Sequence, residues 1–236
     1  MRLYYPRLSP DREIELTGED FNYLKNVLRA NVGDKLSIFD GNGNSAQAVI
    51  TGVYSSRITA LTGSVSAPEK TESPLKTVLL QGMLKGQKMD LVIQKAVELG
   101  VSEIIPMITA RTEVRETRKV ERWKKIAAEA AKQCGRAVMP EISEPAAFKE
   151  CVKNFQAGII FWEGGGDSLN KAPSSLREQK SLAIAIGPEG GFTEDEASLA
   201  RQAGFYVCSL GPRILRAETA AIAALALVQY EFGDLG

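Results

Sequence analysis

The chain has 236 residues, of which 44% are hydrophobic, as expected for a globular protein that buries a sizeable core. Its 29 Lys and Arg residues balance its 29 Asp and Glu residues, so any contact with nucleic acid must depend on a local patch of charge. The absence of histidine excludes a Ser-His-Asp triad, zinc sites with histidine ligands and the most common general base. Three scattered cysteines fit reduced thiols and cannot form a cysteine-only zinc site, so we expect no metal.

Neither secretion nor membrane insertion is indicated by the hydrophobic segments. The first residues, MRLYYPR, lack the apolar core of a signal peptide. The longest apolar run, Ala220–Val228, is far shorter than a membrane span. We therefore expect a cytoplasmic protein that does not contact a membrane.

Residues 1–66 are predicted to form a small β-rich domain. A short helix beginning near Thr17 carries apolar residues on one face, and alternating apolar and polar residues predict strands near 35–39, 46–53 and 57–63. Short strands separated by Gly and Asn favour a compact barrel. The polar segment 66–74, SAPEKTESP, reads as a linker, so we expect one domain at 1–68 and a second at 74–236.

From Leu75 onward, strands and helices alternate, which is typical of a parallel α/β sheet. The apolar runs predict strands at 77–83, 103–108, 138–142 and 158–162, and the intervening periodic segments predict helices at 89–99, 120–133 and 145–155.

One segment of the second domain concentrates positive charge. Residues 111–136 contain nine basic and four acidic residues. Such clustering suits contacts with nucleic-acid phosphates, and it is equally typical of a solvated helix face. Lys85 and Lys88 flank a loop at a strand end, where cations meet either phosphates or water.

The last quarter of the chain repeats one pattern of strand, glycine-proline loop and helix. The apolar run Leu182–Ile186 precedes the loop GPEGG, and Thr193 with Glu196 predicts a capping box at the start of a helix. The run Phe205–Leu210 precedes a second loop and a helix from Ala217. Glycines remove Cβ atoms where a ligand approaches, and such loops lie at the carboxyl ends of parallel strands. The spacing matches neither the dinucleotide fingerprint nor the P-loop, so ordinary turns and ligand loops both remain open.

The segments IGPEGGFT and LGPRILRAETA resemble the cofactor-binding signature of the RsmE family, the 16S rRNA uridine-N3 methyltransferases of the SPOUT superfamily. Upstream, KGQKMDLVIQKAVELGV and RWKKIAAEAAKQCGRAVMPEI also look like segments of that family. The resemblance implies a SPOUT-type parallel α/β sheet with a C-terminal trefoil knot, preceded by a PUA-like β-barrel that binds RNA. It further implies S-adenosyl-L-methionine as cofactor, the 16S rRNA of the small ribosomal subunit as partner, and a homodimer.

The resemblance also implies which residues form the site. Cofactor contacts are expected from Trp162, Glu163, Gly187, Pro188, Glu189, Gly190, Gly191, Leu210, Gly211, Ile214, Leu215, Arg216 and Thr219. RNA contacts are expected from Tyr23, Arg29, Lys85, Lys88, Arg111, Arg115 and Arg118. Tyr23 stands where the family commonly has histidine, and a tyrosine can still stack on a base. Gln87, in place of the more common aspartate, and the run Gly164–Gly166 are further departures.

The uracil N3 must lose a proton during such a methylation. Without histidine, the candidates are a carboxylate base, Glu189 or Glu218, or arginines that stabilise the imide anion, Arg136 or Arg216. Glu218 also fits a helix N-terminal carboxylate with no chemical role. Two other functions remain as alternatives. The first is ribose 2′-O-methylation, but the Asn-rich first motif of enzymes with that activity is not visible in this sequence. The second is a non-catalytic rRNA-binding protein, against which the intact glycine loops argue.

Overall fold

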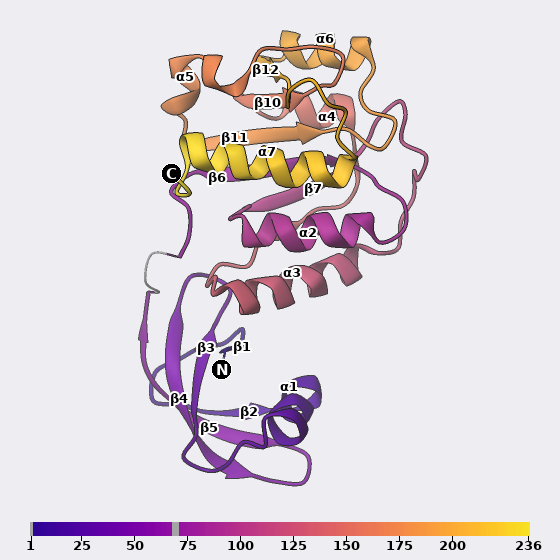
Figure 1. Ribbon diagram of the computed structural model, residues 1–236. Coiled ribbons are helices and arrows are strands. Elements are labelled where there is room, and N and C mark those ends of the chain that lie inside the picture. The colour runs from indigo at the N-terminus through magenta and orange to yellow at the C-terminus, as the bar shows by residue number, and fades with distance from the viewer. Residues whose placement is uncertain (1, 68–70) are drawn as a thin grey trace. The chain divides into compact units, whose positions relative to one another are not determined.

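The computed structural model describes residues 2–67 and 71–236, which form two compact units (Figure 1). The first unit contains the described residues up to Glu72 together with Ala131–Met139, and the second contains Ser73–Ala130 and Pro140–Gly236. The expected linker at 66–74 lies partly outside the described residues. Residues 131–139, expected in the second domain, group with the first unit.

One carboxylate joins these residues to the first unit, in addition to main-chain hydrogen bonds from Gly43 to Ala137 and from Met139 to Gly41. Glu72 Oε1 accepts hydrogen bonds from the N–H groups of Ala137 (3.0 Å) and Val138 (3.1 Å). Its Oε2 accepts from Arg136 Nε (2.9 Å) and lies 2.8 Å from Arg136 Nη2. The last residues before the second unit are therefore tied to the main chain that follows helix α3 (Val120–Cys134).

The first unit is an open, partly curled sheet rather than the expected barrel. Its strands are β1 (Arg2–Tyr4), β2 (Glu13–Leu16), β3 (Lys35–Phe39), β4 (Ser45–Val53) and β5 (Ile58–Ser66). Their order is β1-β3-β4-β5-β2, and within the described residues β1 does not pair with β2. Both edge strands are short, so they offer too few ladder hydrogen bonds to close the sheet on itself.

Alternation along the strands builds the core of this unit. In β4 every second residue is buried, including Ala48 and Ile50, as period-two patterning requires. The expected short helix is present as α1 (Gly18–Asn22), which continues as a π-helical turn over Tyr23–Val27 and buries Leu24 completely.

The second unit confirms the predicted parallel α/β sheet. Its strands are β6 (Lys76–Gly82), β7 (Glu103–Ile108), β8 (Glu141–Ile142), β9 (Ala146–Ala147), β10 (Gly158–Phe161), β11 (Ser181–Ile186) and β12 (Phe205–Cys208). The order is β12-β10-β11-β6-β7-β8, with β9 also pairing with β7, and every pairing is parallel. Two expectations need correction: the strand at 138–142 shrinks to β8, and the helix at 145–155 begins later because Ala146–Ala147 joins the sheet as β9.

Helices cover both faces of this sheet. Besides α3 they are α2 (Lys88–Glu98), α4 (Phe148–Lys153), α5 (Ser174–Arg177), α6 (Glu194–Gln202) and α7 (Ala217–Phe232), and a 3₁₀ turn spans Leu169–Lys171. Val78 and Leu80 of β6 point into a core shared with Phe148 and Phe192, next to α4 and α6. The alternate strand residues face α7, which contacts α2 and β11 (Figure 1). Across the described residues, no helix is both long and apolar enough to cross a membrane.

The strand order places several loops at one edge of the sheet. The chain runs outward through β6, β7 and β8, then returns to form β10, inserts β11 between β10 and β6, and finally adds β12 beside β10. Such a reversal of strand order marks the place where open α/β sheets bind ligands, just beyond the carboxyl ends of the strands. Here those ends belong to β6, β11, β10 and β12.

A buried glutamine fastens the far end of α7. Gln229 is fully buried; its Oε1 accepts from Ser73 Oγ (2.9 Å), and its Nε2 donates to the carbonyl oxygen of Leu99 (3.1 Å). The hydrogen bonds join the C-terminal helix to the segment before β6 and to the end of α2.

Gln229→Met keeps the volume of this side chain and removes both hydrogen bonds. Because the Leu99 carbonyl and the Ser73 hydroxyl lose partners in a buried site, we expect a loss of about 1–3 kcal/mol in the free energy of unfolding. Urea denaturation of the full chain measures it as a lower midpoint with an unchanged slope. Gln202→Met, at an exposed position of α6, is the matched control. Equal midpoints for the two variants would contradict this role.

Candidate active site

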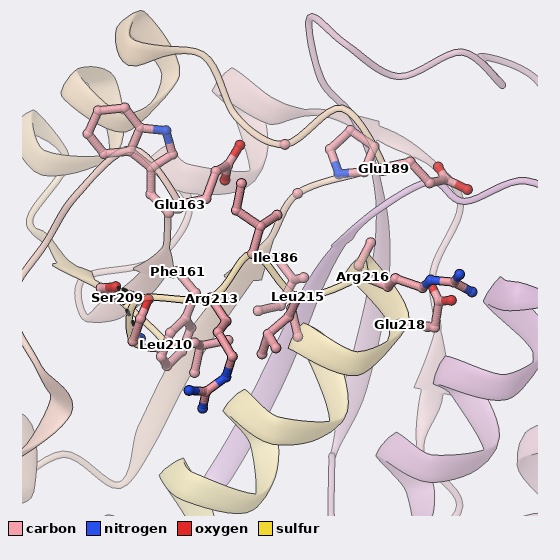
Figure 2. A pocket seen from close by; sticks show the side chains of 18 of the residues that line it. Phe161, Glu163, Ile186, Glu189, Ser209, Leu210, Arg213, Leu215, Arg216 and Glu218 are labelled. Atoms are coloured by element: carbon pink, nitrogen blue, oxygen red, sulfur yellow. Dashed lines mark hydrogen bonds between the residues drawn. The ribbon is translucent and has the colours of Figure 1, made fainter.

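A cavity of about 330 Å³ lies at the carboxyl ends of β10, β11 and β12 (Figure 2). Three chain segments and one side chain of α2 form it. They are Phe161–Glu163, the loop after β11 from Ile186 to Gly191 without Gly190, Ser209–Glu218 with Ala220, and Lys88. The cavity therefore occupies the position that the reversal of strand order predicts.

Glycines in and beside the loop Gly187–Gly191 allow close contacts between the loop and its surroundings. Gly191 has φ +67°, and a Cβ there would overlap the carboxylate of Glu163. A Cβ at Gly82, at the end of β6, would overlap Pro188. The loop main chain is thus exposed to the cavity on one side and packed against β6 on the other, which only glycine permits at these positions.

Lys85, Lys88 and Arg111, which lie outside this loop, bind it through hydrogen bonds. Glu189 Oε1 accepts from the N–H of Lys85 (3.1 Å) and from Lys88 Nζ (3.0 Å). Partial burial by itself would raise the pKa of Glu189, but these hydrogen bonds outweigh it and lower the pKa. Arg111 Nη1 donates to the carbonyl oxygens of Gly190 (2.8 Å) and Phe192 (3.3 Å). The loop is anchored to the ends of β6 and β7.

The capping box predicted for the next helix is confirmed. Thr193 Oγ1 accepts from the N–H of Glu196 (3.2 Å), and Glu196 Oε2 accepts from the N–H of Thr193 (2.9 Å). The second oxygen of Glu196 accepts from the N–H of Ala110 (2.8 Å). This nearly buried carboxylate therefore sets where the loop ends and binds it to the segment after β7.

The second loop, Ser209–Arg216, leads directly into α7. Gly211 has φ +96°, and Ile214 is 86% exposed. Figure 2 shows apolar side chains of Phe161, Ile186 and Leu215 near the middle of the pocket. A pocket of this kind accepts a flat apolar ring beside polar main-chain groups.

Three carboxylates line the cavity, and their surroundings differ. Glu189 is engaged as described, and Glu163 is exposed next to Gly191. Glu218 is half-buried, and its Oε2 is shielded from solvent without a hydrogen-bond partner among the described residues. Cys208 lies just before the second loop, and burial raises the pKa of its thiol to about 11, so it is a neutral group rather than a nucleophile.

Most of the expected cofactor contacts converge on this cavity. Of those residues, only Gly190 and Thr219 do not line it: Gly190 packs against Arg111, and Thr219 is exposed. Sequence reasoning missed several lining residues, namely Phe161, Ile186, Ser209, Pro212, Arg213, Ala217 and Ala220. The signal for them was present, because they adjoin the predicted strand ends or lie within the motif LGPRILRAETA.

The four expected catalytic residues do not all share this site. Arg216, Glu189 and Glu218 line the cavity, whereas Arg136 does not. Arg136 belongs to the first unit, is 4% exposed and pairs with Glu72. Its guanidinium is committed to a structural ion pair, so its catalytic role stays a prediction that this geometry does not support.

The expected RNA contacts fall in both units. Lys88 lines the cavity, Lys85 and Arg111 hold the adjoining loop, and Arg115 and Arg118 are exposed farther along the segment after β7. In the first unit, Tyr23 is 46% exposed on the π-helical turn and Arg29 is exposed just after it.

Comparisons with known proteins agree with this architecture. Residues 71–229 match the family model of the RNA methyltransferase domain, and residues 16–60 match that of the RNA methyltransferase PUA domain. Ribosomal RNA small subunit methyltransferase E of Bacillus subtilis is 34% identical over 229 residues, which is 92% of this chain and 89% of that protein.

Two solved structures are similar over almost the whole chain. The enzyme of the same name from Neisseria gonorrhoeae, bound to S-adenosyl methionine, has a TM-score of 0.92 with 33% identity, covering 100% of this chain and 99% of that one. A putative methyltransferase from Legionella pneumophila with bound cofactor has a TM-score of 0.90 with 36% identity, covering 99% and 98%. With its PUA segment, its RNA methyltransferase domain and its full-length similarity to these proteins, this chain belongs to the ribosomal RNA small subunit methyltransferase E family.

Proposed function

We propose that this chain transfers a methyl group from S-adenosyl-L-methionine to N3 of a uridine in 16S rRNA of the small ribosomal subunit. One observation carries the proposal: the glycine loops at the ends of β10, β11 and β12 enclose a single cavity, in a chain that aligns end to end with enzymes of this family. The RNA substrate is inferred from the names of the relatives, and the cofactor site is inferred from the cavity.

The residues that line the cavity fit such a cofactor. Its volume of about 330 Å³ lies at the small end of ordinary ligand pockets. Phe161, Ile186 and Leu215 offer an apolar surface for an adenine ring, and the glycine loops present main-chain donors and acceptors to its edge. The exposed carboxylate of Glu163, beside Gly191, suits hydroxyl or ammonium groups. When bound, the cofactor supplies a methyl group already activated on a sulfonium.

The chain's own contribution is then to position the base and stabilise charge. Loops anchored by Glu189 and Arg111 have little freedom to move, and precise positioning lowers such barriers by on the order of 7–11 kcal/mol in the best cases. Arg216 precedes α7 and lines the cavity, where its charge favours a developing imide anion.

We also propose the finer features that the family resemblance implies. The last helix, α7, threads a loop to make a trefoil knot, and its packing against β11 and α2 supports this. An experimental structure in which α7 passes through no loop would contradict it. Leu227 and Tyr230 of α7 are 45% and 64% exposed, which supports a homodimer through this helix. A monomeric mass in light scattering at micromolar concentration would contradict the dimer.

We further propose that residues 1–68 act as the RNA-binding domain and that the protein works without metal in the cytoplasm.

The proposed activity is tested by mass spectrometry of 16S rRNA from cells with and without the gene, followed by incubation of the deficient rRNA with purified protein. We expect N3-methyluridine to be missing from the deficient cells and restored by the protein with S-adenosylmethionine. Appearance of a ribose-methylated nucleotide instead would identify a different reaction.

Gly191→Ala should abolish most cofactor binding. The added Cβ would displace the Glu163 carboxylate from its place beside the loop, and it would strain the main chain at a φ that L-residues rarely adopt. We expect S-adenosylmethionine affinity in calorimetry to fall at least about 10-fold, which corresponds to ~1.4 kcal/mol. Gly18→Ala is the matched control, because its φ is +60° and a Cβ there meets open space in the first unit, outside the cavity. Similar affinity in the two variants would remove the Gly191 loop from the binding site.

Arg115→Gln and Arg118→Gln should weaken rRNA binding equally for cognate and unrelated RNA. If each arginine meets one phosphate, the slope of log affinity against log salt should become shallower by about 0.7–0.9 per lost contact. Filter binding at several salt concentrations measures the slope. Arg201→Gln, at an exposed position of α6, is the control. A slope unchanged in all three variants would show that the basic segment is only a solvated surface.

A further inference from the structure

The proposed reaction requires a group that takes the proton from uracil N3. No histidine is present in the chain, and the carboxylates that line the cavity are Glu163, Glu189 and Glu218. Which of them is suited to accept a proton follows from what each oxygen already binds.

Glu189 is poorly suited because its carboxylate is already in use. Two donors, the Lys85 N–H and Lys88 Nζ, hold its Oε1, and they lower the pKa of the group against the opposing effect of burial. A carboxylate with a lowered pKa is a weaker base, and protonating it would also release the loop it anchors.

Glu163 is exposed to water and lies at the far end of the pocket from α7 in Figure 2. Its carboxylate lies against Gly191, within the loop surface that suits the cofactor. A group in that position serves cofactor binding rather than the reacting base.

Glu218 has the unusual combination of a fixed position and an unused acceptor. It is the second residue of α7, so the helix holds its main chain rigidly beside the cavity. Its Oε2 is shielded from solvent yet has no hydrogen-bond partner among the described residues. A shielded acceptor without a partner destabilises a folded protein, and a hydrogen-bond donor on a bound substrate would relieve that cost.

Glu218 is accompanied by a cation of the same helix terminus. Arg216, the residue before the first turn of α7, lines the cavity and is exposed. The edge of a uracil carries one donor, N3–H, between two carbonyl oxygens. One carboxylate acceptor and one guanidinium donor complement that edge, whereas a cytosine, with an unprotonated N3, offers nothing to the carboxylate at this position.

We infer that Glu218 is the catalytic base, accepting the N3 proton of the target uracil while Arg216 neutralises the imide oxygens; this rests on the proposed function. The N–H bond of N3 breaks and its proton forms an O–H bond with the Glu218 carboxylate. The electron pair left on N3 forms the new N–C bond to the methyl group, and the C–S bond breaks with its pair retained on sulfur. The negative carboxylate and the positive sulfonium are both neutralised, so charge and atoms balance.

The test is Glu218→Gln in the full-length protein, with single-turnover methylation of 16S rRNA. Gln has the same shape and cannot act as a base, so we expect the rate at neutral pH to fall by about 100-fold or more. Affinity for S-adenosylmethionine by calorimetry, rRNA binding and the urea midpoint should stay close to wild type. Glu194→Gln is the matched control, since it removes an exposed carboxylate from the first turn of α6, outside the cavity.

A second substrate separates a base from other roles. Fluorine at C5 of the target uridine makes N3–H more acidic and so lessens the need for a base. We expect the gap between wild type and Glu218→Gln to shrink about 10-fold or more with 5-fluorouridine rRNA, as Brønsted behaviour requires. Glu218→Asp, which keeps a carboxylate, should retain more activity than the Gln variant.

Each other outcome overturns the inference. A Gln variant with the wild-type rate, or an equal loss on both substrates, removes Glu218 as the base. If the Gln variant loses activity in proportion to weaker S-adenosylmethionine binding, Glu218 serves cofactor binding. If it loses activity together with a lower urea midpoint, Glu218 stabilises the start of α7. Failure of the wild-type protein to form N3-methyluridine would refute the proposed function itself, which keeps the two claims distinguishable.

Discussion

The site depends on one steric constraint: the loop Gly187–Gly191 lies so close to other parts of the second unit that a Cβ at Gly82 would overlap its main chain. Gly82 at the end of β6 allows Pro188 to approach, and Gly191 allows the carboxylate of Glu163 to approach. Because these contacts come from β6, β10 and β11, the loop cannot keep its shape unless all three strands are in register. The cavity is therefore a property of the whole sheet edge.

Charged side chains also hold the loop in place through hydrogen bonds. Glu189 binds the segment after β6, Arg111 binds two carbonyl oxygens of the loop, and Glu196 binds the segment after β7. Each of these side chains is charged, and each satisfies main-chain groups that an irregular loop would otherwise leave unpaired. Lys85, Lys88 and Arg111, which we expect to contact RNA, thus also hold the loop that lines the cavity.

Helix α7 joins the pocket to the rest of the second unit. At its C-terminal end Gln229 is fixed to Ser73 and Leu99, and at its N-terminal end Arg216 and Glu218 face the cavity. Regular helical structure begins at Ala217, so Arg216 and Glu218 lie at the start of the helix. Residues placed there keep their geometry even though the preceding loop, with the exposed Ile214, is irregular.

The sequence by itself determined the parallel sheet, the two glycine loops after successive strands, the capping box at Thr193 and the family. These follow from local patterns: apolar runs, glycine spacing and a motif of consecutive residues. It also excluded histidine chemistry. Only the tertiary structure showed that the first unit is an open sheet, that Arg136 is committed to Glu72, and that Glu189 and Glu218, both acidic residues beside glycine loops, are in opposite situations. The physical reason is that ion pairing, shielding from water and strand closure depend on partners far away in the chain, as Glu72 and Arg136 or Lys88 and Glu189 are. No pattern of neighbouring residues specifies which distant group a carboxylate will meet.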